Sequence, residues 1–544
     1  MATVLARDLG KGGSSASTTS LDGNIPPLGA PTEEKKSWFQ RSPYLDRDAV
    51  ATQLSVFDDP VMAEKYHPRP EWENTHRFDP LFRWTWREEF RLVRKIDLYI
   101  MVWACIMFMA LELDRANISQ ALTDNLLPDL NLTTNEDYNL GNTVFKLSFL
   151  CAELPSQLVS KWMGPDRWIP LQITLWSIVA GSQFWLSGRE SFLVTRALLG
   201  ILQGGFIPDI VIYLSYFYKH AELSIRLSFF WTAMSLADIL AAIFAYGLLR
   251  MRGIEGRDGW RWMFLIEGLL TLTIGVLSWV LMPAGPCETA SWFRGKKGWF
   301  TEHEEKIMVN RVLRDDPSKS TMHNREPVTP KLLWQSLQDY DLWPLYILGL
   351  IFQIPMTPPQ QYLTLTLKGW VFTMVGLTYL SERTGQLTLV ALLGQLWALP
   401  FLIYMNVANT VLANKWVIWT VVTLLLGYPN AHPIQVAWNS RNSNAVRSRT
   451  VSAACYNMFV QAGGIISSNI YRNDDKPRYV RGNRQLLALL CMNIVVYGLV
   501  KSYYVWRNKQ RDRKWGAMTP EQRLDYLSTT TDQGNKRLDF RFDH

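Results

Sequence analysis

The sequence predicts an all-α membrane protein built from two six-helix halves, with about 12 transmembrane helices and a truncated eighth span. First, long runs lack Asp, Glu, Lys and Arg, among them 21 residues at 168–188 and 28 residues at 387–414. A bilayer core about 30 Å thick needs about 20 apolar residues per helix. Second, twelve such segments can be found, more than a soluble core would contain. Third, a charged stretch of about 60 residues separates the first six from the last six.

The average composition conceals this pattern. Hydrophobic residues make up 48% of the 544-residue chain and the mean hydropathy is −0.03, values typical of a soluble protein. Charged residues gather at both ends and in the centre, which excludes a uniformly globular chain and a wholly disordered one. The net charge of +8 comes mostly from basic residues beside the spans, and it predicts no nucleic-acid partner. The five cysteines lack the spacing of a disulfide set or a zinc site.

The segments follow one another in a simple order. We expect residues 1–95 to form a cytoplasmic N-terminal tail, mostly disordered, in which residues 82–90 lie at the membrane surface. Residues 96–282 form the N-terminal half, 283–341 a cytoplasmic central loop, 342–505 the C-terminal half and 506–544 a cytoplasmic C-terminal tail. The spans fall near 96–113, 139–160, 168–188, 193–218, 227–249 and 262–282, then near 342–367, 369–380, 387–407, 416–438, 450–471 and 485–505.

Lysine and arginine predict the orientation of the chain. Five basic residues from Arg83 to Lys95 precede the first span, and five from Arg507 to Lys514 follow the last. Cytoplasmic loops carry such an excess, so we expect both termini in the cytoplasm and the protein in the plasma membrane. Six spans on each side of a polar loop are typical of transporters with two parallel halves, which bind substrate between the halves near mid-membrane.

The eighth segment is too short to cross a bilayer. Residues 369–380 number 12, about 18 Å of helix. Residues 343–380 number 38, about 57 Å, which is less than two crossings of about 30 Å with a turn between them. Either span 8 is truncated or this segment does not cross. Four prolines also predict a broken seventh span: Pro344, Pro355, Pro358 and Pro359.

Several motifs resemble those of one transporter family. Residues 113–119 read LDRANIS at the end of span 1, residues 163–167 read MGPDR between spans 2 and 3, and residues 260–268 read WRWMFLIEG at the start of span 6. With the polar stretch 438–483, the chain resembles the fungal anion:cation symporters of the major facilitator superfamily over roughly residues 72–514. That group includes allantoate, nicotinate, pantothenate and sulfonate-type permeases. The resemblance implies the major facilitator fold and uptake of a small organic anion, such as a vitamin or nitrogen-source carboxylate, by proton symport.

Two features depart from the family pattern. The family usually has more residues between spans 7 and 8, so we interpret the short span 8 as a deletion, such as one from a misplaced splice boundary. In span 4, proton-coupled members often carry Glu seven residues after an Arg. Here Gln203 follows Arg196 at that distance, on the same helix face. Because Gln cannot exchange a proton, the family's coupling at this position is not implied.

Family resemblance and the cost of burying charge in hydrocarbon together select the candidate site residues. An Arg guanidinium offers a planar fork to a carboxylate or sulfonate. The candidates for substrate binding are Arg115, Arg196, Gln203, Asn457 and Gln461, and those for proton coupling are Asp114, Glu153 and His432. Structural or gating roles are assigned to Asp166, Arg167, Glu267 and Arg441.

Each assignment has an alternative. Asp114 and Arg115 could form a structural ion pair at the outer end of span 1, and Arg196 could extend its charge toward the membrane boundary. Lys146 and Glu153, seven residues apart, face either one another or the cavity. His432 lies between two prolines and either titrates near neutral pH or has a structural role.

Soluble-enzyme chemistry is not indicated. The chain lacks a Walker A sequence, a GxSxG elbow and an HExxH motif, and residues 303–305 are expected on the solvated face of a charged helix. We therefore expect no enzyme activity, no cofactor and no metal, and a monomer whose partners are a small organic anion, protons and the lipid bilayer. Two other functions stay open: a non-transporting nutrient receptor, or an inactive or mis-spliced member of the family.

Overall fold

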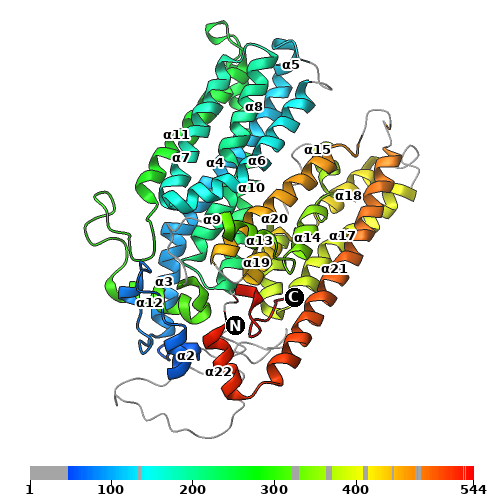
Figure 1. Ribbon diagram of the computed structural model, residues 1–544. Helices are drawn as coiled ribbons and strands as arrows, with labels where there is room; N and C mark the ends of the chain where they lie inside the picture. Colours follow the sequence, from blue (N-terminus) through cyan, green and yellow to red (C-terminus); the bar gives the residue numbers. More distant parts are fainter. Residues whose placement is uncertain are drawn as a thin grey trace.

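Two helical bundles lie side by side (Figure 1). The computed structural model describes residues 47–132, 137–320, 330–362, 371–407, 415–443, 446–471, 475, 479–530, 532 and 534–544. Over these ranges the regular structure is helical, apart from two isolated β-bridges. The prediction of an all-α protein with two halves is confirmed. Residues 1–46, expected to be disordered, lie outside the described residues.

The first bundle contains the predicted spans 1 to 6. α3 (Trp86–Ile96) continues through a short π turn (Asp97–Met101) into α4 (Val102–Ala121), so the first span begins earlier than predicted and absorbs part of the expected surface segment. The other helices are α6 (Asn139–Met163), α7 (Pro165–Ser182), α8 (Arg189–Gln203), α9 (Phe206–Ser215), α10 (His220–Leu248) and α11 (Gly259–Leu281).

The predicted fourth span is divided into α8 and α9 by Gly204 and Gly205. Gly205 has φ +87°, a conformation that side-chain-bearing residues rarely adopt. A Cβ at this position would lie 2.3 Å from Ser156 Oγ on α6. The glycine therefore permits both the break in the helix and the close approach of α6.

The second bundle contains the predicted spans 7 to 12. α17 (Leu387–Val407) has the predicted bounds, whereas the predicted tenth span is divided into α18 (Lys415–Leu426) and α19 (His432–Ser443) around Pro429. The remaining helices are α14 (Trp343–Ile351), α15 (Thr357–Tyr362), α16 (Val371–Thr384), α20 (Val446–Ser468) and α21 (Val480–Gly516). Spans 7 and 10 are thus both interrupted helices.

α16 lies where the short eighth span is predicted. Its 14 described residues, Val371–Thr384, make about 21 Å of helix, and residues 363–370 directly before it lie outside the described residues, so the predicted truncation stays a prediction. Among the described residues, six helices are long and apolar enough to cross a membrane, and α16 is not one of them.

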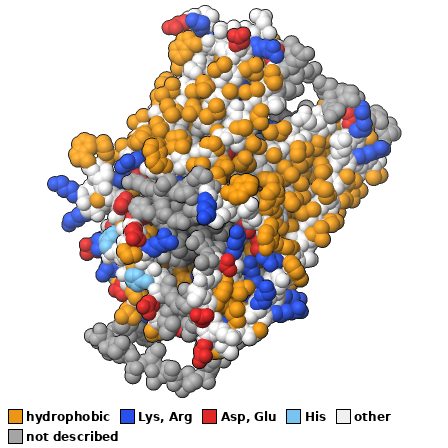
Figure 2. Space-filling view, viewed as in Figure 1, with side chains coloured by type: hydrophobic (Ala, Val, Ile, Leu, Met, Phe, Trp, Pro, Cys, Tyr) orange, Lys and Arg blue, Asp and Glu red, His pale blue; other side chains and the backbone are white. Residues whose placement is uncertain are grey.

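The surface of both bundles suits a lipid environment. Hydrophobic side chains cover the sides of the bundles, and charged side chains gather at the end that carries α12 (Glu302–Asp315) and α22 (Pro520–Thr529) (Figure 2). Leu98, Ile243, Leu269, Val495 and Leu499 are each more than half exposed. Apolar surface of this extent, on helices whose backbone groups bond internally, is typical of a membrane protein. We call the end with α12 and α22 the α12 end.

Residues 47–95 are folded, which corrects the prediction that most of the N-terminal tail is disordered. They contain η1 (Val56–Asp58), α2 (Pro60–Lys65) and η2 (Thr75–Arg77), followed by the start of α3. Phe57 is buried in one cluster with Leu313 of α12, and Asp58 pairs with Arg314 at 2.6 Å. The charged composition of this segment concealed a small apolar core completed by the central loop.

α12 also corrects the prediction of a solvated face at residues 303–305. Glu305 pairs with Arg77 at 2.8 Å, and Glu304 pairs with Lys95 of α3 at 2.8 Å. His303 Nε2 lies 2.9 Å from Glu88 Oε1. The acidic face of α12 is therefore a contact surface for the N-terminal segment and α3.

The two bundles meet along two sets of helices. α6 packs against α20, and α9 also contacts α20. α10 packs against α16 and α19. Predicted site residues lie on three of these helices, α6, α19 and α20.

Candidate functional site

A polar cluster built around Arg115 lies beside the boundary between the halves. Arg115 is on α4, and its Nε donates a hydrogen bond to Gln203 Oε1 of α8 at 3.1 Å. Its Nη1 donates to Glu112 Oε1, one helical turn earlier, at 2.9 Å. The guanidinium also lies over the ring of Phe149 at 5.0 Å. The fork of Arg115 is thus held by a neutral amide, a carboxylate and an aromatic face.

Glu153 joins this cluster to the other half. Asn457 of α20 donates a hydrogen bond from Nδ2 to Glu153 Oε1 of α6. Glu153 is fully buried and interacts electrostatically with Arg115. Within the described part of the chain, its Oε2 has no hydrogen-bond partner. One carboxylate oxygen therefore binds the second half while the other is left for a proton or a ligand.

Lys146 contacts the second half instead of Glu153. Its Nζ donates to the backbone oxygen of Gly464 on α20 at 3.1 Å. The suggested pairing of Lys146 with Glu153 is therefore wrong, although their spacing does put both side chains on the face of α6 that meets α20.

A second polar cluster lies inside the first bundle. Asp114 Oδ2 accepts a hydrogen bond from Trp176 Nε1 at 3.1 Å, and it interacts electrostatically with Arg196 and Glu267. Arg196 donates from Nη2 to Gln183 Oε1 and is buried. Both alternatives offered for these residues are wrong: Asp114 does not pair with Arg115, and Arg196 does not extend to the membrane boundary.

Successive residues on a helix explain this separation. Asp114 and Arg115 differ by about 100° in direction around α4, so one enters the first bundle and the other faces the cluster of Glu112 and Gln203. Arg196 and Gln203 are both buried on α8, as their spacing predicts, but they contact different groups.

His432 lies at the first position of α19 among aromatic rings. Its ring is parallel to that of Phe352, with centroids 5.5 Å apart, and its Nδ1 lies 3.4 Å from Tyr456 Oη. Tyr456 itself donates to Gln435 Oε1 at 2.7 Å. Gln461, one turn beyond Asn457 on α20, is half-buried. Sequence reasoning assigned no partner to His432 and did not single out Glu112, Phe149 or Gln435.

A small cavity of about 20 Å³ lies between the halves, on the α12 side of Asn457. That volume has room for about one water molecule. Its lining includes His432, Asn439, Ser440 and Asn457 of the second half, and it faces apolar residues of α9 such as Val211. Polar side chains thus line one wall and apolar side chains the other. A small organic molecule can occupy this position only after the halves move apart.

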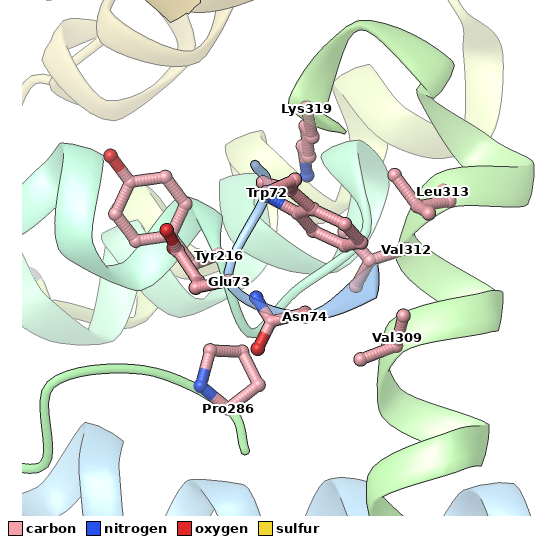
Figure 3. Close-up of a pocket in the computed structure, with 9 residues that line it drawn as sticks. All are labelled: Trp72, Glu73, Asn74, Tyr216, Pro286, Val309, Val312, Leu313 and Lys319. Atoms are coloured by element: carbon pink, nitrogen blue, oxygen red, sulfur yellow. The ribbon is translucent and has the colours of Figure 1, made fainter. Parts of the chain in front are cut away.

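A separate pocket at the α12 end belongs to the packing of the N-terminal segment (Figure 3). Trp72 stands between Val312 and Leu313 of α12 on one side and Lys319 on the other (Figure 3). Burial lowers the pKa of Lys319 to about 8, and its Nζ donates to the backbone oxygen of Tyr218 at 2.9 Å. This pocket is remote from the Arg115 cluster.

Arg441 ties the two halves together at the α12 end. From α19, it donates to Ser224 Oγ of α10 at 2.8 Å and to Glu382 of α16. Asp166, at the start of α7, interacts electrostatically with Arg294, and Arg167 is exposed. Among the four residues assigned structural or gating roles, Arg441 is therefore the one that bridges the halves.

Comparisons with known proteins give the chain a family context. The sequence profile of the Major Facilitator Superfamily matches residues 104–468. Uncharacterized transporter YIL166C of Saccharomyces cerevisiae is 47% identical over 522 residues, covering 92% of this chain and 96% of that protein. Because 92% of 544 residues is about 500, about 20 of those aligned positions fall in gaps of this chain.

Two further comparisons concern a bacterial relative and a solved structure. A putative tartrate transporter of Agrobacterium vitis is 30% identical over 234 residues, covering 43% of this chain and 50% of that protein. The proton:xylose symporter XylE has a similar fold, with a TM-score of 0.56 at 15% identity, covering 75% of this chain and 95% of that one.

Proposed function

This chain belongs to the major facilitator superfamily, and we propose that it takes up a small organic anion across the plasma membrane by proton symport. The observation that carries the proposal is the placement of a cation and an acid, Arg115 and Glu153, beside the boundary between the halves. Transporters of this architecture bind substrate between their halves and expose it to each side in turn.

Arg115 is the proposed anion-binding residue. Its guanidinium stays charged at any physiological pH and presents a planar set of donors that fits a carboxylate or sulfonate. Glu112 holds one of those donors in this structure, so a substrate carboxylate would take the place of Glu112. Gln203 and Phe149 would keep the guanidinium in position. Arg196 points into the first bundle and would act on the site only indirectly.

The anion class rests on two supports. The motifs of spans 1, 2 and 6 resemble those of the fungal anion:cation symporters, and a relative at 30% identity is named a putative tartrate transporter. Tartrate is a carboxylate, like pantothenate, allantoate and nicotinate. We therefore propose a monocarboxylate or dicarboxylate, or a sulfonate, recognised by Arg115.

Proton-coupled members of the family often have a Glu at the position where this chain has Gln203. We propose that Glu153 carries the proton instead. As a carboxylate it accepts the hydrogen bond of Asn457 across the boundary. Protonation removes the charge that attracts Arg115 and converts one acceptor oxygen into a donor. Proton binding would thus change a contact between the halves, which is what coupling requires. Asp114 and His432 lie in other environments and are second choices.

Uptake of radiolabelled candidates into permease-deficient yeast, with and without a protonophore, tests this proposal. We expect accumulation that the protonophore abolishes. For Glu153→Gln, which keeps an oxygen to accept from Asn457, we expect binding with uptake that no longer depends on the proton gradient. Uptake indifferent to the protonophore in the unmodified chain would overturn proton coupling.

A nutrient receptor is the second candidate, favoured by Gln203 and by the short α16. It predicts ligand binding at the cell surface without accumulation. An inactive or mis-spliced product predicts neither binding nor surface expression. The same yeast strain distinguishes the three outcomes when surface expression, binding and accumulation are measured together.

A further inference from the structure

The C-terminal residues occupy a groove at the α12 end of the second bundle, beside α19 and α21 (Figure 1). Two asparagines bind the backbone of this segment. Asn508 of α21 donates to the oxygen of Phe542 and accepts from its N–H, both at 2.8 Å. Asn442 of α19 donates to the oxygen of Asp543 at 3.2 Å and accepts from its N–H at 2.9 Å. Each side-chain amide thus pairs with both polar groups of one residue.

Two aromatic side chains anchor the segment. Phe540 and Phe542 are 5% and 2% exposed, and they share a buried cluster with Trp438 and Tyr504. The guanidinium of Arg511 lies 4.5 Å from the centre of the Phe542 ring. The alternation of buried Phe540 and Phe542 is that of an extended peptide, whose alternate residues point to one side.

The docked segment is connected to the contact between the halves. Trp438 Nε1 of α19 donates to the backbone oxygen of Asp543 at 2.7 Å. The Asp543 carboxylate lies 3.6 Å from Arg441. Arg441 is the residue that reaches Ser224 on α10 of the first bundle. The C-terminal segment therefore contacts Arg441, the side chain that joins the two halves.

We propose that residues 538–544 are a peptide clamp, carried by this chain, that holds the α12 end closed. The groove formed by Asn442, Asn508, Arg511 and Trp438 is its binding site, and the sequence LDFRFDH of this chain is its occupant. Alternating access requires α19 to move away from α10 at this end, so release of the segment favours the open state. The proposal depends only on that movement, and it stands whether or not the substrate is an anion or a proton is cotransported.

Accessibility of the closed cavity tests the clamp. Ser440 lines the cavity between the halves and is 6% exposed, so Ser440→Cys reports opening at this end. The full-length chain in nanodiscs is treated with a maleimide, and labelling of position 440 is followed by peptide mass spectrometry, which ignores the five native cysteines. With Phe540→Ala and Phe542→Ala together, we expect labelling at least fivefold faster. Asp543→Asn should give a smaller increase.

Two controls make the outcome specific. Phe293→Ala removes an exposed aromatic ring from the central loop and should leave the labelling rate unchanged. A synthetic LDFRFDH peptide, added to the double Phe variant, should restore slow labelling, whereas LDARADH should not. Rescue by the peptide cannot come from a misfolded protein. Equal labelling rates in all variants, or no effect of LDFRFDH, would overturn the clamp.

Discussion

Arg115 gains its position from its neighbours as much as from its own charge. Gln203 binds Nε and Glu112 binds Nη1, so the plane of the guanidinium is fixed before any substrate arrives. A preorganised fork loses less side-chain entropy when it binds an anion. Asp114, one residue earlier, shares the sequence motif but belongs to the cluster inside the first bundle. Adjacent residues of one motif therefore have different roles.

Substitution of Arg115 by Lys separates geometry from charge. Lys keeps the positive charge but cannot bond Gln203 and Glu112 with two fixed nitrogens of one plane. Loss of a charge-assisted hydrogen bond costs about 1.5–3 kcal/mol, so we expect uptake at low substrate concentration to fall at least about tenfold. Uptake assays in yeast measure it, with Arg250→Lys as the matched control, since Arg250 is exposed in the short turn after α10. Unchanged uptake in Arg115→Lys would exclude a bidentate role.

The sequence predicted which charged residues belong to the candidate site more readily than it predicted their contacts. The cost of charge in hydrocarbon selected Arg115 and Glu153, and both lie close to the boundary. Their partners depend on how two bundles dock, which spacing within one helix cannot specify. For the same reason the suggested pairing of Lys146 with Glu153 was wrong, because both side chains contact α20.

At the scale of elements, composition predicted the apolar helices well and their interruptions poorly. α17, Leu387–Val407, lies within the uncharged run of residues 387–414, from which it was predicted. The breaks at Gly205 and Pro429 were missed because no charged residue interrupts residues 197–208 or 416–440, and the spans were predicted from charge-free runs. The N-terminal segment was missed because its small apolar core forms only against α12. Individual glycine and proline residues account for the two breaks, and tertiary packing against α12 accounts for the folded N-terminal segment.

Gly205 offers a test of one such break. Its left-handed backbone costs a substituted residue about 1–2 kcal/mol, and a Cβ would lie 2.3 Å from Ser156 Oγ and 3.3 Å from the backbone oxygen of Glu153. We therefore expect Gly205→Ala to lower the melting temperature in detergent and to disturb uptake. Gly247→Ala is the control, since nothing lies within 4 Å of its Cβ and Ala favours a helix by about 1 kcal/mol. Equal melting temperatures for the two variants would contradict the argument.

The short α16 leads to a second test at this scale. About 20 aligned positions of the yeast relative fall in gaps of this chain, and residues 343–380 are too few for two crossings of a bilayer core with a turn between them. We expect that inserting the relative's residues between α15 and α16 will raise surface expression and uptake severalfold. Fluorescent tagging and uptake assays measure both. Two results together would contradict a deletion: a transcript that encodes the present sequence with no additional residues, and no gain in surface expression or uptake when the relative's residues are inserted.

At the scale of the whole molecule, the contacts between the halves are not alike along their length. Near the middle of the helices a carboxylate–amide bond joins α6 to α20. At the α12 end, Arg441 of the second half donates a hydrogen bond to Ser224 of the first, and Asp316 of the central loop contacts both Arg449 of the second half and His220 of the first. The central loop therefore connects the halves in sequence and also fastens them in space.

Asp316 of the central loop is the acid on which this fastening depends. It pairs with Arg449 of α20 at 2.9 Å and lies 3.2 Å from His220 Nε2 at the start of α10. Burial acts to raise the pKa of Asp316, but Arg449 and then His220 outweigh it, so the pKa is well below its usual range. The carboxylate is therefore charged throughout the physiological range of pH. A group with a depressed pKa stabilises the folded state above its usual pKa of about 4, and that contribution is lost only as pH falls below it.

Asp316→Asn is expected to loosen the α12 end at every pH between 5 and 8. The substitution leaves Arg449, which is charged at every pH in this range, buried without its counter-charge, and breaking a buried pair in this way costs about 3–5 kcal/mol. We expect Ser440→Cys to react severalfold faster in this background, with the same increase at pH 5 as at pH 8. Glu521→Gln on the exposed face of α22 is the charge-matched control. If the faster labelling of Asp316→Asn disappeared at pH 5, a histidine rather than Asp316 would control the contact. If the labelling rate of Asp316→Asn were unchanged at both pH values, the central loop would not hold the halves together.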